Sequence, residues 1–355
     1  MAPQPPASEL LLSACLVVRD EAARIGACLD ALTGLADEVV VHDTGSTDGT
    51  LDALRRRDVV LVEGTWADDF AAARNTALRA AHGEWVLSLD ADEVATADGP
   101  ALRARLATCP ERRLLVTIVN EGPAPAGGYA FTAVRLFRRE GARWRGRVHE
   151  RVVHEGVVHE GVVPGAPAEG ALPEELLTLQ HSGYATAEAL QRKGRRNAAL
   201  AQRALDELLA SADPDPRELA ALALDLGRAS MGAGQLQRAV DAFEAVRDAT
   251  GAGLLWQQAT DYLARLLLGA GQPDVALVLA EQLRGSGAGA EHCDWLRAQA
   301  LAQLGRVAEA LDLLAGITRL VDTAGRRQDL RLVEELRVLC REVLAAAPRA
   351  PTPPG

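Results

Sequence analysis

A repeated segment in the C-terminal half of the 355-residue chain constrains its fold more than any other feature. The three copies begin with GAGQLQRA at Gly232, GAGQPDVA at Gly269 and QLGRVAEA at Gln303. Their central glycines lie 37 and 34 residues apart, and an alanine follows each glycine after five residues. These pairs are Gly234 and Ala239, Gly271 and Ala276, and Gly305 and Ala310. Such a spacing indicates stacked helix-turn-helix units, each of which buries its apolar face against the next.

The turn glycine, the small residue in the second helix and the period together predict tetratricopeptide-like repeats over residues 215–346. An irregular helical bundle is the alternative interpretation. A helix over residues 186–214 would link the repeats to the first half of the chain, and residues 326–346 would form a terminal capping helix. We expect disorder in the Pro-rich stretches 1–10 and 347–355.

The first half of the chain alternates strand and helix patterns. Apolar runs predict strands over 11–18, 38–41, 59–63 and 84–89. Apolar residues at helical spacing predict helices over 21–32, 50–57 and 70–82. This order predicts a parallel, doubly wound sheet with right-handed crossovers. Further strands are predicted over 114–120, 131–137 and 148–163, the last as a hairpin, so that one α/β domain would span residues 11–185.

Three polar clusters follow predicted strands of this sheet. They read VVRDE from Val17, DTGSTDGT from Asp43 and DADE from Asp90. Because ligands bind at the carboxyl ends of the strands in an open α/β sheet, we expect the clusters to share one site. Asp90 and Asp92 offer hard oxygen ligands for Mg²⁺ or Mn²⁺, with phosphate oxygens completing the shell. The alternatives are a turn with a helix N-cap for 43–50 and a solvated acidic turn for 90–93.

Several motifs together resemble a known family. The Asp43 cluster and the Asp90-x-Asp92 pair are similar to those of inverting family-2 glycosyltransferases, whose α/β domain has the Rossmann-like GT-A fold of nucleotide-diphospho-sugar transferases. The chain resembles more narrowly a subgroup with C-terminal tetratricopeptide repeats, which includes the peptide S-glycosyltransferases of glycopeptide bacteriocin pathways. The segments that carry this likeness are VVRDE at Val17, WADDFAAARN at Trp66, RLFRR at Arg135, GRVHE at Gly146 and HSGY at His181.

The resemblance implies a binding site for a UDP-sugar donor and a divalent cation, Mg²⁺ or Mn²⁺. The residues implied to bind the donor are Val18, Arg19, Glu21, Asp43, Ser46, Asp69, Arg74, Asp90 and Ala91. Among them, Asp43 would accept a hydrogen bond from uracil or ribose, Asp90 would contact ribose, and Arg74 would reach the base edge or a phosphate. Asp92 would coordinate the metal, which neutralises the diphosphate leaving group, and His181 would complete the metal shell. For His181, a structural role at the domain junction is the alternative.

Inversion requires one in-line displacement at the anomeric carbon, during which the acceptor loses a proton. A carboxylate within hydrogen-bond reach is the usual base. Glu150 is the first candidate and Glu93 the second, while His149 would orient the base or touch a phosphate. A Cys thiol as acceptor would need less help, since its pKa of about 8.5 already leaves some thiolate at neutral pH. Trp66 and Trp144 would stack on a sugar or peptide or, alternatively, belong to the core.

Composition restricts the partners. The net charge of −11 argues against general nucleic-acid binding and gives no attraction to an anionic membrane. No apolar stretch reaches the length of about 18 residues that a membrane span needs, and the N-terminus lacks the basic start of a signal peptide. The five scattered cysteines form no Cys-x-x-Cys pair, so we expect a cytoplasmic protein without disulfides or a zinc site.

Other functional classes fit less well. In a haloacid-dehalogenase phosphatase the acidic motif would follow the first strand instead of the fourth. Neither the Gly-rich loop of a sugar nucleotidyltransferase nor a P-loop occurs. A repeat scaffold with a degenerate transferase domain is the non-enzymatic alternative. The acceptor stays open between a peptide Cys, Ser or Thr, a carbohydrate and a small molecule, and we expect the repeats to recruit a peptide or protein acceptor or to form a homodimer.

Overall fold

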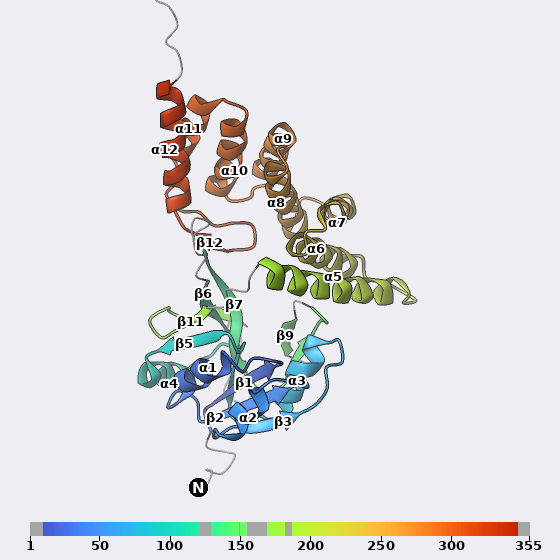
Figure 1. Cartoon of the computed structure of the whole chain (residues 1–355), viewed down its shortest axis with the longest axis vertical. Helices are drawn as coiled ribbons and strands as arrows, with labels where there is room; N and C mark the ends of the chain where they lie inside the picture. The colour runs from blue at the N-terminus through green and yellow to red at the C-terminus, as the bar shows by residue number, and fades with distance from the viewer. Residues whose placement is uncertain (1–9, 121–128, 149, 155–168, 182–186, 347–355) are drawn as a thin grey trace, which may run out of the picture. The chain divides into compact units, whose positions relative to one another are not determined.

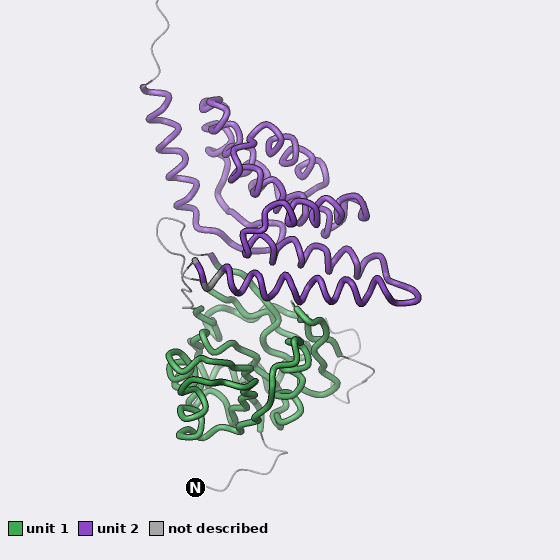
Figure 2. The backbone as a smooth tube through the Cα atoms, turned by 45° about the vertical axis from the view of Figure 1, so that its right-hand side comes forward, with its two compact units in different colours: residues 1–121, 130–185 green, residues 122–129, 186–355 purple. Residues whose placement is uncertain are grey.

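The computed structural model describes residues 10–120, 129–148, 150–154, 169–181 and 187–346. The chain divides into two compact units, which Figure 2 draws in different colours. The first unit consists of residues 1–121 and 130–185, and the second of residues 122–129 and 186–355. Each unit has hydrophobic clusters of its own.

The first unit is built around a mixed β-sheet with helices (Figure 1). Its strands are β1 (Leu12–Val18), β2 (Glu38–Asp43), β3 (Val60–Glu63), β4 (Trp85–Leu89), β5 (Glu93–Ala97), β6 (Arg113–Asn120), β7 (Tyr129–Arg138), β8 (Ala142–Arg145), β9 (Arg151–His154), β10 (Glu169–Ala171) and β11 (Leu177–His181). Its helices are α1 (Ile25–Leu32), α2 (Thr50–Arg55), α3 (Phe70–Ala80) and α4 (Gly99–Ala107). The sheet order is β3-β2-β1-β4-β7-β6-β11-β5, with β10 beside β6, while β8 and β9 form a separate two-stranded sheet.

The first four predicted strands form as expected. β1 pairs in parallel with β2 and β4, and β2 pairs in parallel with β3. The later strands, for which no direction was predicted, make the sheet mixed, since β7 runs antiparallel to β4, and β5 antiparallel to β11. In the described part of this unit only α4 separates the later strands, and parallel neighbours need a long crossover connection. The later strands therefore run in both directions, which yields a mixed sheet.

The centre of the sheet decides where the polar clusters lie. β4 is buried along its whole length and β1 over nearly all of it, because both strands are apolar apart from Ser13 and Ser88. Since β1, β2 and β4 are parallel neighbours, their carboxyl ends meet at one edge of the sheet. Residues 19–21, 43–50 and 90–93 follow these ends and are thus gathered at that edge.

The segment predicted as a hairpin over 148–163 is described only in part. Its residues Arg151–His154 form β9, which pairs antiparallel with β8, upstream of that segment. Trp144 on β8 lies opposite Val152 and packs against Phe137, with ring centroids 5.6 Å apart. Residues 155–168 lie outside the described part of the chain.

The second unit is helical. Its helices are α5 (Ala187–Leu209), α6 (Pro216–Gly232), α7 (Leu236–Ala249), α8 (Leu254–Gly269), α9 (Pro273–Gly285), α10 (Ala290–Gln303), α11 (Val307–Ala315) and α12 (Arg331–Ala346), with the short strand β12 (Arg327–Gln328) before α12. The segment predicted as a linker helix forms α5, which packs closely on α6. A Cβ added to Gly194 would lie 2.4 Å from the backbone nitrogen of Ala233. Among the described residues, no helix is long and apolar enough to cross a membrane.

The predicted helix-turn-helix units are confirmed at α6–α7, α8–α9 and α10–α11. Gly234, Gly271 and Gly305 lie in the three turns with φ of +73°, +69° and +75°, where a side chain would be strained. In each turn the residue after the glycine donates its N–H to the carbonyl five residues earlier. The alanines five residues after the glycines are at most 1% exposed, so the second helix of each pair packs closely on the first.

Candidate functional site

The start of α3 positions the central cation of the candidate site. Asp69 caps the helix by accepting a hydrogen bond from the Ala72 N–H at 2.8 Å. The helix therefore begins at Phe70, and Arg74 lies about one turn into it on the buried side. The predicted donor-binding residue Asp69 is thus the N-cap of the helix that carries Arg74.

Arg74 connects the end of β4 to the segment before β9. The residue is 8% exposed and donates through all three nitrogens of its guanidinium. Nε donates to Glu150 Oε1 at 2.5 Å, Nη1 to Ser88 Oγ at 2.9 Å, and Nη2 to Asp90 Oδ1 at 2.7 Å. A buried charge is tolerated only where it is paired and hydrogen-bonded, and here it is both. The structure thereby brings together three residues predicted for the site, Arg74, Asp90 and Glu150, and adds Ser88.

A second arginine, Arg135 on β7, whose side chain is 13% exposed, contacts the other side of the acidic turn. Its Nη2 lies 3.2 Å from Asp90 Oδ2 and 2.7 Å from Glu93 Oε1. Glu93 is 1% exposed, and its Oε2 accepts the Asp90 N–H at 2.8 Å. Burial raises the pKa of the Glu93 carboxyl, against the lowering influence of Arg135. Both oxygens of Asp90 are therefore engaged by arginines. No role was predicted for Arg135, although the RLFRR motif marked its position.

Asp92 and His181 meet at the open side of the acidic turn. His181 is the last residue of β11. Because β11 pairs with β5, His181 lies opposite Glu93, the residue that follows Asp92 in the sequence. The His181 Nε2 lies 3.1 Å from Asp92 Oδ2, and both side chains are about one fifth exposed. The two residues predicted as metal ligands, 89 positions apart in the sequence, are thus neighbours.

The donor set at this place fits a divalent cation that is shared with a substrate. A carboxylate oxygen and an imidazole nitrogen are ligands that Mn²⁺ accepts, and the oxygen alone also suits Mg²⁺. Within the described residues no group of three His, Cys, Asp or Glu side chains is arranged to hold a metal ion. The remaining ligands of an ion at Asp92 and His181 would therefore have to come from phosphate oxygens and water.

Asp43, at the end of β2, presents a buried oxygen without a partner. The residue is 1% exposed, and its Oδ1 accepts the N–H groups of Gly45 at 2.9 Å and Ser46 at 2.8 Å. Its Oδ2 is buried and has no hydrogen-bond partner among the described residues. Leaving a buried acceptor unpaired costs about 1–3 kcal/mol, so a ligand that brings an N–H or O–H group would gain by binding there.

Hydrogen bonds tie the ends of β1 and β2 into one rigid edge. Asp20, with a φ of +56°, uses Oδ1 to accept the Thr47 N–H at 2.7 Å, and its own N–H donates to Ser46 Oγ at 2.9 Å. The Thr44 N–H donates to the Val18 carbonyl at 3.0 Å. The hydroxyl of Ser46 and the carbonyl of Val18 therefore hold the loop in this structure. Sequence reasoning missed Asp20, although it belongs to the VVRDE motif.

The other residues predicted for the donor line the same edge. The Glu21 N–H donates to Thr50 Oγ1 at 2.8 Å. Burial raises the pKa of Glu21 and the negative charge of Asp92 raises it further, so the two carboxylates lie within electrostatic range of each other. Arg19 has a half-exposed side chain, and Ala91 is 5% exposed between the two aspartates of the acidic turn.

Asn75, Trp66 and Trp144 make structural contacts near the site. The Asn75 side chain accepts the Trp144 N–H at 2.9 Å and donates to the Trp144 carbonyl at 3.0 Å, which fixes β8 against α3. Trp144 is 6% exposed and lies 5.1 Å below the Arg74 guanidinium, so its core interpretation applies. Trp66 donates to Asp68 Oδ1 at 2.9 Å. His149, the predicted neighbour of the base, lies outside the described residues.

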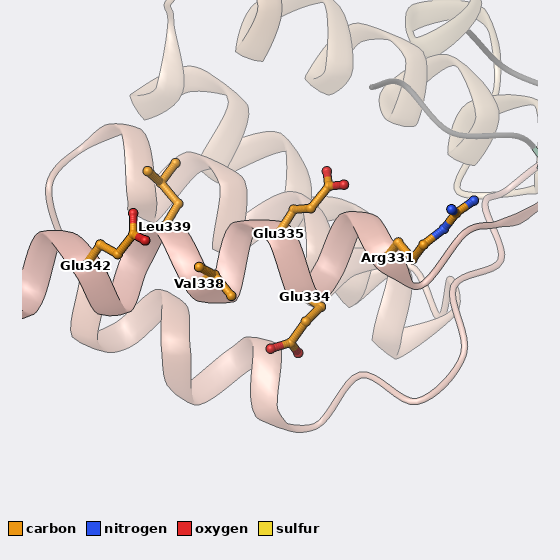
Figure 3. Close-up of a pocket in the computed structure, with 6 residues that line it drawn as sticks. All are labelled: Arg331, Glu334, Glu335, Val338, Leu339 and Glu342. Atoms are coloured by element: carbon orange, nitrogen blue, oxygen red, sulfur yellow. The ribbon is translucent and has the colours of Figure 1, made fainter. Parts of the chain in front are cut away.

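The helical unit carries a shallow hollow of a different kind. It has a volume of about 420 Å³ and lies on α12, as Figure 3 shows. Its lining residues are Arg331, Glu334, Glu335, Val338, Leu339 and Glu342. All of these residues belong to one helix. The hollow is therefore a surface feature, and its polar side chains do not converge on one point as those of a ligand site do.

Comparison with known proteins agrees with this geometry. Residues 13–103 match the family model described as glycosyl transferase family 2. The matched segment runs from β1 into α4 and contains Asp43, Arg74, Asp90 and Asp92. The resemblance to family-2 glycosyltransferases that the motifs indicated is confirmed for this segment.

Individual relatives match over part of their length. A TPR repeat-containing protein of Synechococcus elongatus is 40% identical over 144 residues, which are 40% of this chain and 35% of that protein. The SPbeta prophage-derived glycosyltransferase SunS of Bacillus subtilis is 30% identical over 139 residues, which are 38% of this chain and 33% of that protein. The chain thus spans about a third of the length of these curated relatives. Among solved structures, S. aureus TarS 1–349 in complex with UDP-GlcNAc aligns with a TM-score of 0.40 and 14% identity, over 83% of this chain and 92% of that chain.

Proposed function

We propose that this chain is a metal-dependent, inverting glycosyltransferase that moves a sugar from a UDP-sugar to an acceptor. The observation that carries the proposal is the meeting of Asp92 and His181 beside the Arg74–Asp90 pair, at the carboxyl ends of the sheet. A carboxylate and an imidazole can hold a divalent cation that neutralises a diphosphate, and the Arg74–Asp90 pair keeps the acidic turn that carries Asp92 in place. The family-2 match over residues 13–103 and the glycosyltransferase among the relatives support the same class.

The nucleoside of the donor is proposed to lie along the joined ends of β1 and β2. Asp43 Oδ2 would accept an N–H or O–H group of uracil or ribose, which would satisfy the buried oxygen. The backbone at Val18 and Arg19 would flank the base. Ser46 and Asp69 would act by holding the loop and α3 in place, since the described contacts of both are with the backbone.

The diphosphate is proposed to lie over the acidic turn. Asp92 and His181 would hold Mg²⁺ or Mn²⁺, which supplies positive charge to the leaving diphosphate when it is bound. Asp90 and Ala91 would line the ribose side of this turn, and Glu21 would add negative charge near the cation. Arg74 and Arg135 keep the turn in one shape, because each arginine engages one oxygen of Asp90.

Glu150 is the proposed base. Arg74 Nε contacts its Oε1 at 2.5 Å and thereby fixes the direction of the carboxylate, which is 13% exposed. The acceptor atom would attack the anomeric carbon from the face opposite the diphosphate and lose its proton to Glu150, while the nucleoside diphosphate leaves. Glu93, the second candidate, has one oxygen on Arg135 and the other on the Asp90 N–H, an arrangement that favours a positioning role. His149 would orient the base.

The acceptor is proposed to be a peptide Cys, Ser or Thr side chain presented by the repeats. The TPR repeat-containing relative and the repeated helical pairs of this chain support a peptide-binding role for the second unit. A homodimer formed through the repeats and a cytoplasmic location belong to the same proposal.

Titration of UDP-sugars in the presence and absence of Mn²⁺ tests the proposal. We expect binding that is stronger with Mn²⁺, together with slow release of UDP by hydrolysis of one donor in a panel. Asp92→Asn should remove the Mn²⁺-dependent part of the binding and leave the metal-free part, while Asp58→Asn, at an exposed position between α2 and β3, should change neither. Absence of nucleotide-sugar binding, or binding that is indifferent to Asp92→Asn, would contradict the proposal.

A further inference from the structure

A long connection separates the last two helices of the second unit. Residues 316–330 join α11 to α12, whereas three residues suffice for each turn at Gly234, Gly271 and Gly305. Connections longer than about 12 residues are uncommon in compact domains and tend to have a function of their own. We call residues 316–330 the connecting segment.

The connecting segment folds back on itself as a small hairpin. The Gln328 N–H donates to the Leu320 carbonyl at 2.9 Å. Asp322 Oδ1 accepts the Arg326 N–H at 2.9 Å, and Gly325 has a φ of +79° at the tip. Hydrogen bonds within the connecting segment thus hold the tip in one conformation, in addition to the contacts that the segment makes with the helices.

Thr323, at the tip of this hairpin, is gripped at two points by α8. Its hydroxyl donates to Asp261 Oδ2 at 2.7 Å, and its carbonyl accepts from Gln258 Nε2 at 3.3 Å. Contact with both the side chain and the backbone of one residue is the way in which proteins recognise a peptide residue specifically. Asp261 and Gln258 therefore contact Thr323 through its hydroxyl and its carbonyl, as a binding site contacts a residue of a bound peptide.

Thr318 is gripped in the same way by α10. Glu291 Oε1 accepts the Thr318 hydroxyl at 2.7 Å and the Thr318 N–H at 2.8 Å. The next N–H along the chain, that of Arg319, lies 3.2 Å from the same oxygen. Two threonines five residues apart are thus each held by a carboxylate, one from α8 and one from α10.

Two side chains of the helices, His292 and Arg265, hold the carboxylate of Asp261. It is fully buried, and its Oδ1 lies 2.9 Å from His292 Nε2 and 3.0 Å from Arg265 Nε. A buried carboxylate is an expensive group, and an apolar residue of similar size would tie down a loop at least as well. The helices thus orient the carboxylate that accepts the Thr323 hydroxyl.

The connecting segment leaves a polar group beside Asp261 unsatisfied. His292 Nδ1, on the ring that bonds Asp261, is buried and has no partner among the described residues. Buried polar groups are nearly always hydrogen-bonded, so this unpartnered nitrogen indicates a site made for more contacts than the segment provides.

We propose that the surface of Gln258, Asp261 and Glu291 is a binding site for an extended peptide, and that the connecting segment occupies it as an internal ligand. The peptide it fits carries two Ser or Thr residues five positions apart, each recognised by its hydroxyl and its backbone. An attached segment has an effective concentration in the millimolar range, so an external peptide binds only where it competes with residues 316–328. The inference rests on the peptide-binding part of the proposed function and is independent of sugar transfer.

Peptide binding to the full chain tests the proposal. The probe is a fluorescent synthetic peptide of residues 316–328, followed by anisotropy without any nucleotide sugar. The double variant Thr318→Val and Thr323→Val weakens the internal ligand, because each threonine loses its bond to a carboxylate. We expect this variant to bind the probe about tenfold more tightly than the unaltered chain, or better.

Two controls separate the site from a general loosening of the unit. Glu291→Gln added to the double variant should remove most of the gain in probe affinity. Thr250→Val should leave probe binding as in the unaltered chain, because the Thr250 hydroxyl bonds the Val246 carbonyl of α7. A probe with valine at both threonine positions should bind no variant. Equal binding of the threonine and valine probes, or no binding to a folded double variant, would overturn the proposal.

Hydrogen exchange of the unaltered chain gives a second measurement that does not depend on a variant folding. Saturation with the probe should release the connecting segment from Glu291, so the amides of Thr318 and Arg319 should exchange at least about tenfold faster than in the free chain. Exchange of these amides that stays unchanged at saturating probe would overturn the proposal as well. Both readouts are insensitive to whether the first unit transfers sugar, so they can fail or succeed independently of the transferase activity.

Discussion

At the scale of single residues, the acidic turn shows how neighbours assign different tasks to like side chains. Asp90 is held between two arginines, Glu93 is buried against one of them, and Asp92 stays partly exposed beside His181. In the sequence these three carboxylates lie within four consecutive positions. The pattern predicted that the turn binds something, while the partners that separate a structural carboxylate from a ligand come from distant segments.

Arg74→Lys tests the central pairing. Lysine keeps the charge but cannot direct three N–H groups at Glu150, Ser88 and Asp90, so the partly buried Glu150 and the more exposed Asp90 lose directed hydrogen bonds. We expect the free energy of unfolding to fall by about 3 kcal/mol and the rate of UDP release to fall by about hundredfold. Urea denaturation and a UDP-release assay measure the two effects.

The matched control lies on the same helix. Arg79 on α3 is exposed and donates to Thr76 Oγ1, so Arg79→Lys should change stability by less than about 0.5 kcal/mol. If both substitutions behaved alike, Arg74 would not be the organising cation that its contacts indicate.

Asp261 predicts how the second unit responds to acid. Burial by itself would raise its pKa, but Arg265, His292 and Thr323 outweigh burial and lower the pKa of Asp261 from its ordinary value of 3.8 to about 2. The groups that face it are Arg265 from α8, His292 from α10 and Thr323 from the connecting segment, whose Asp322 lies 3.7 Å from Arg265. A lowered pKa contributes stability above pH 3.8, amounting to about 2 kcal/mol, which is lost as the pH falls towards 2.

Chemical denaturation between pH 5 and pH 2 measures this effect. The decline in stability between about pH 4 and pH 2 should be shallower in Asp261→Asn than in the unaltered chain, since the amide does not titrate. Asp274→Asn, at an exposed position in the first turn of α9, should keep the steep decline. Identical acid profiles for the unaltered chain and Asp261→Asn would show that this carboxylate does not govern the response.

At the scale of elements, backbone conformation and close packing explain the repeated pairs. The glycine in each turn lies in the left-handed region, and the residue after it closes a hydrogen bond back into the first helix. The period of the pattern could be predicted because it arises from local geometry and from burial of one face per helix. The connecting segment breaks that period, and no local signal revealed that it would fold onto α8 and α10.

Gly271→Ala measures the conformational requirement of one turn. A Cβ at this position meets no atom within 4 Å, so any effect comes from the φ of +69° alone. We expect a loss of about 1 kcal/mol in the stability of the second unit, measured by thermal or urea unfolding. Gly269→Ala, in open space at the end of α8, should be neutral or stabilise by up to about 1 kcal/mol. A loss of the same size at both positions would mean that the turn conformation is not the cause.

At the scale of the whole molecule, the hydrophobic clusters divide along the two units. The clusters built on Trp85 and Phe137 consist of residues from the first unit, and those built on Phe243, Leu314 and Ala198 consist of residues from the second. Two cores with separate memberships can unfold separately. The net charge of −11 restricts which partners the chain attracts, but it does not determine the division into two units.

Calorimetry of the full chain should therefore show two unfolding transitions. UDP with Mn²⁺ should raise the midpoint of one transition, because a ligand stabilises the unit that binds it. Gly271→Ala should lower the midpoint of the other transition and leave the first in place. A single transition that moves as a whole with both changes would contradict the independence of the two cores.

The sequence by itself determined the strand and helix order of residues 12–89, the helical repeats after residue 215, and the gathering of polar clusters at one edge of the sheet. These follow from patterns of burial that act over a few residues and from the rule that parallel strands end on the same side. Only the tertiary structure showed that Arg135 contacts Asp90 and Glu93, that Glu150 pairs with Arg74 and His181 with Asp92, and that Thr323 and Thr318 bond Asp261 and Glu291. Such pairings join segments that lie tens of residues apart, and their energy depends on burial and on distances between side chains that no local pattern encodes.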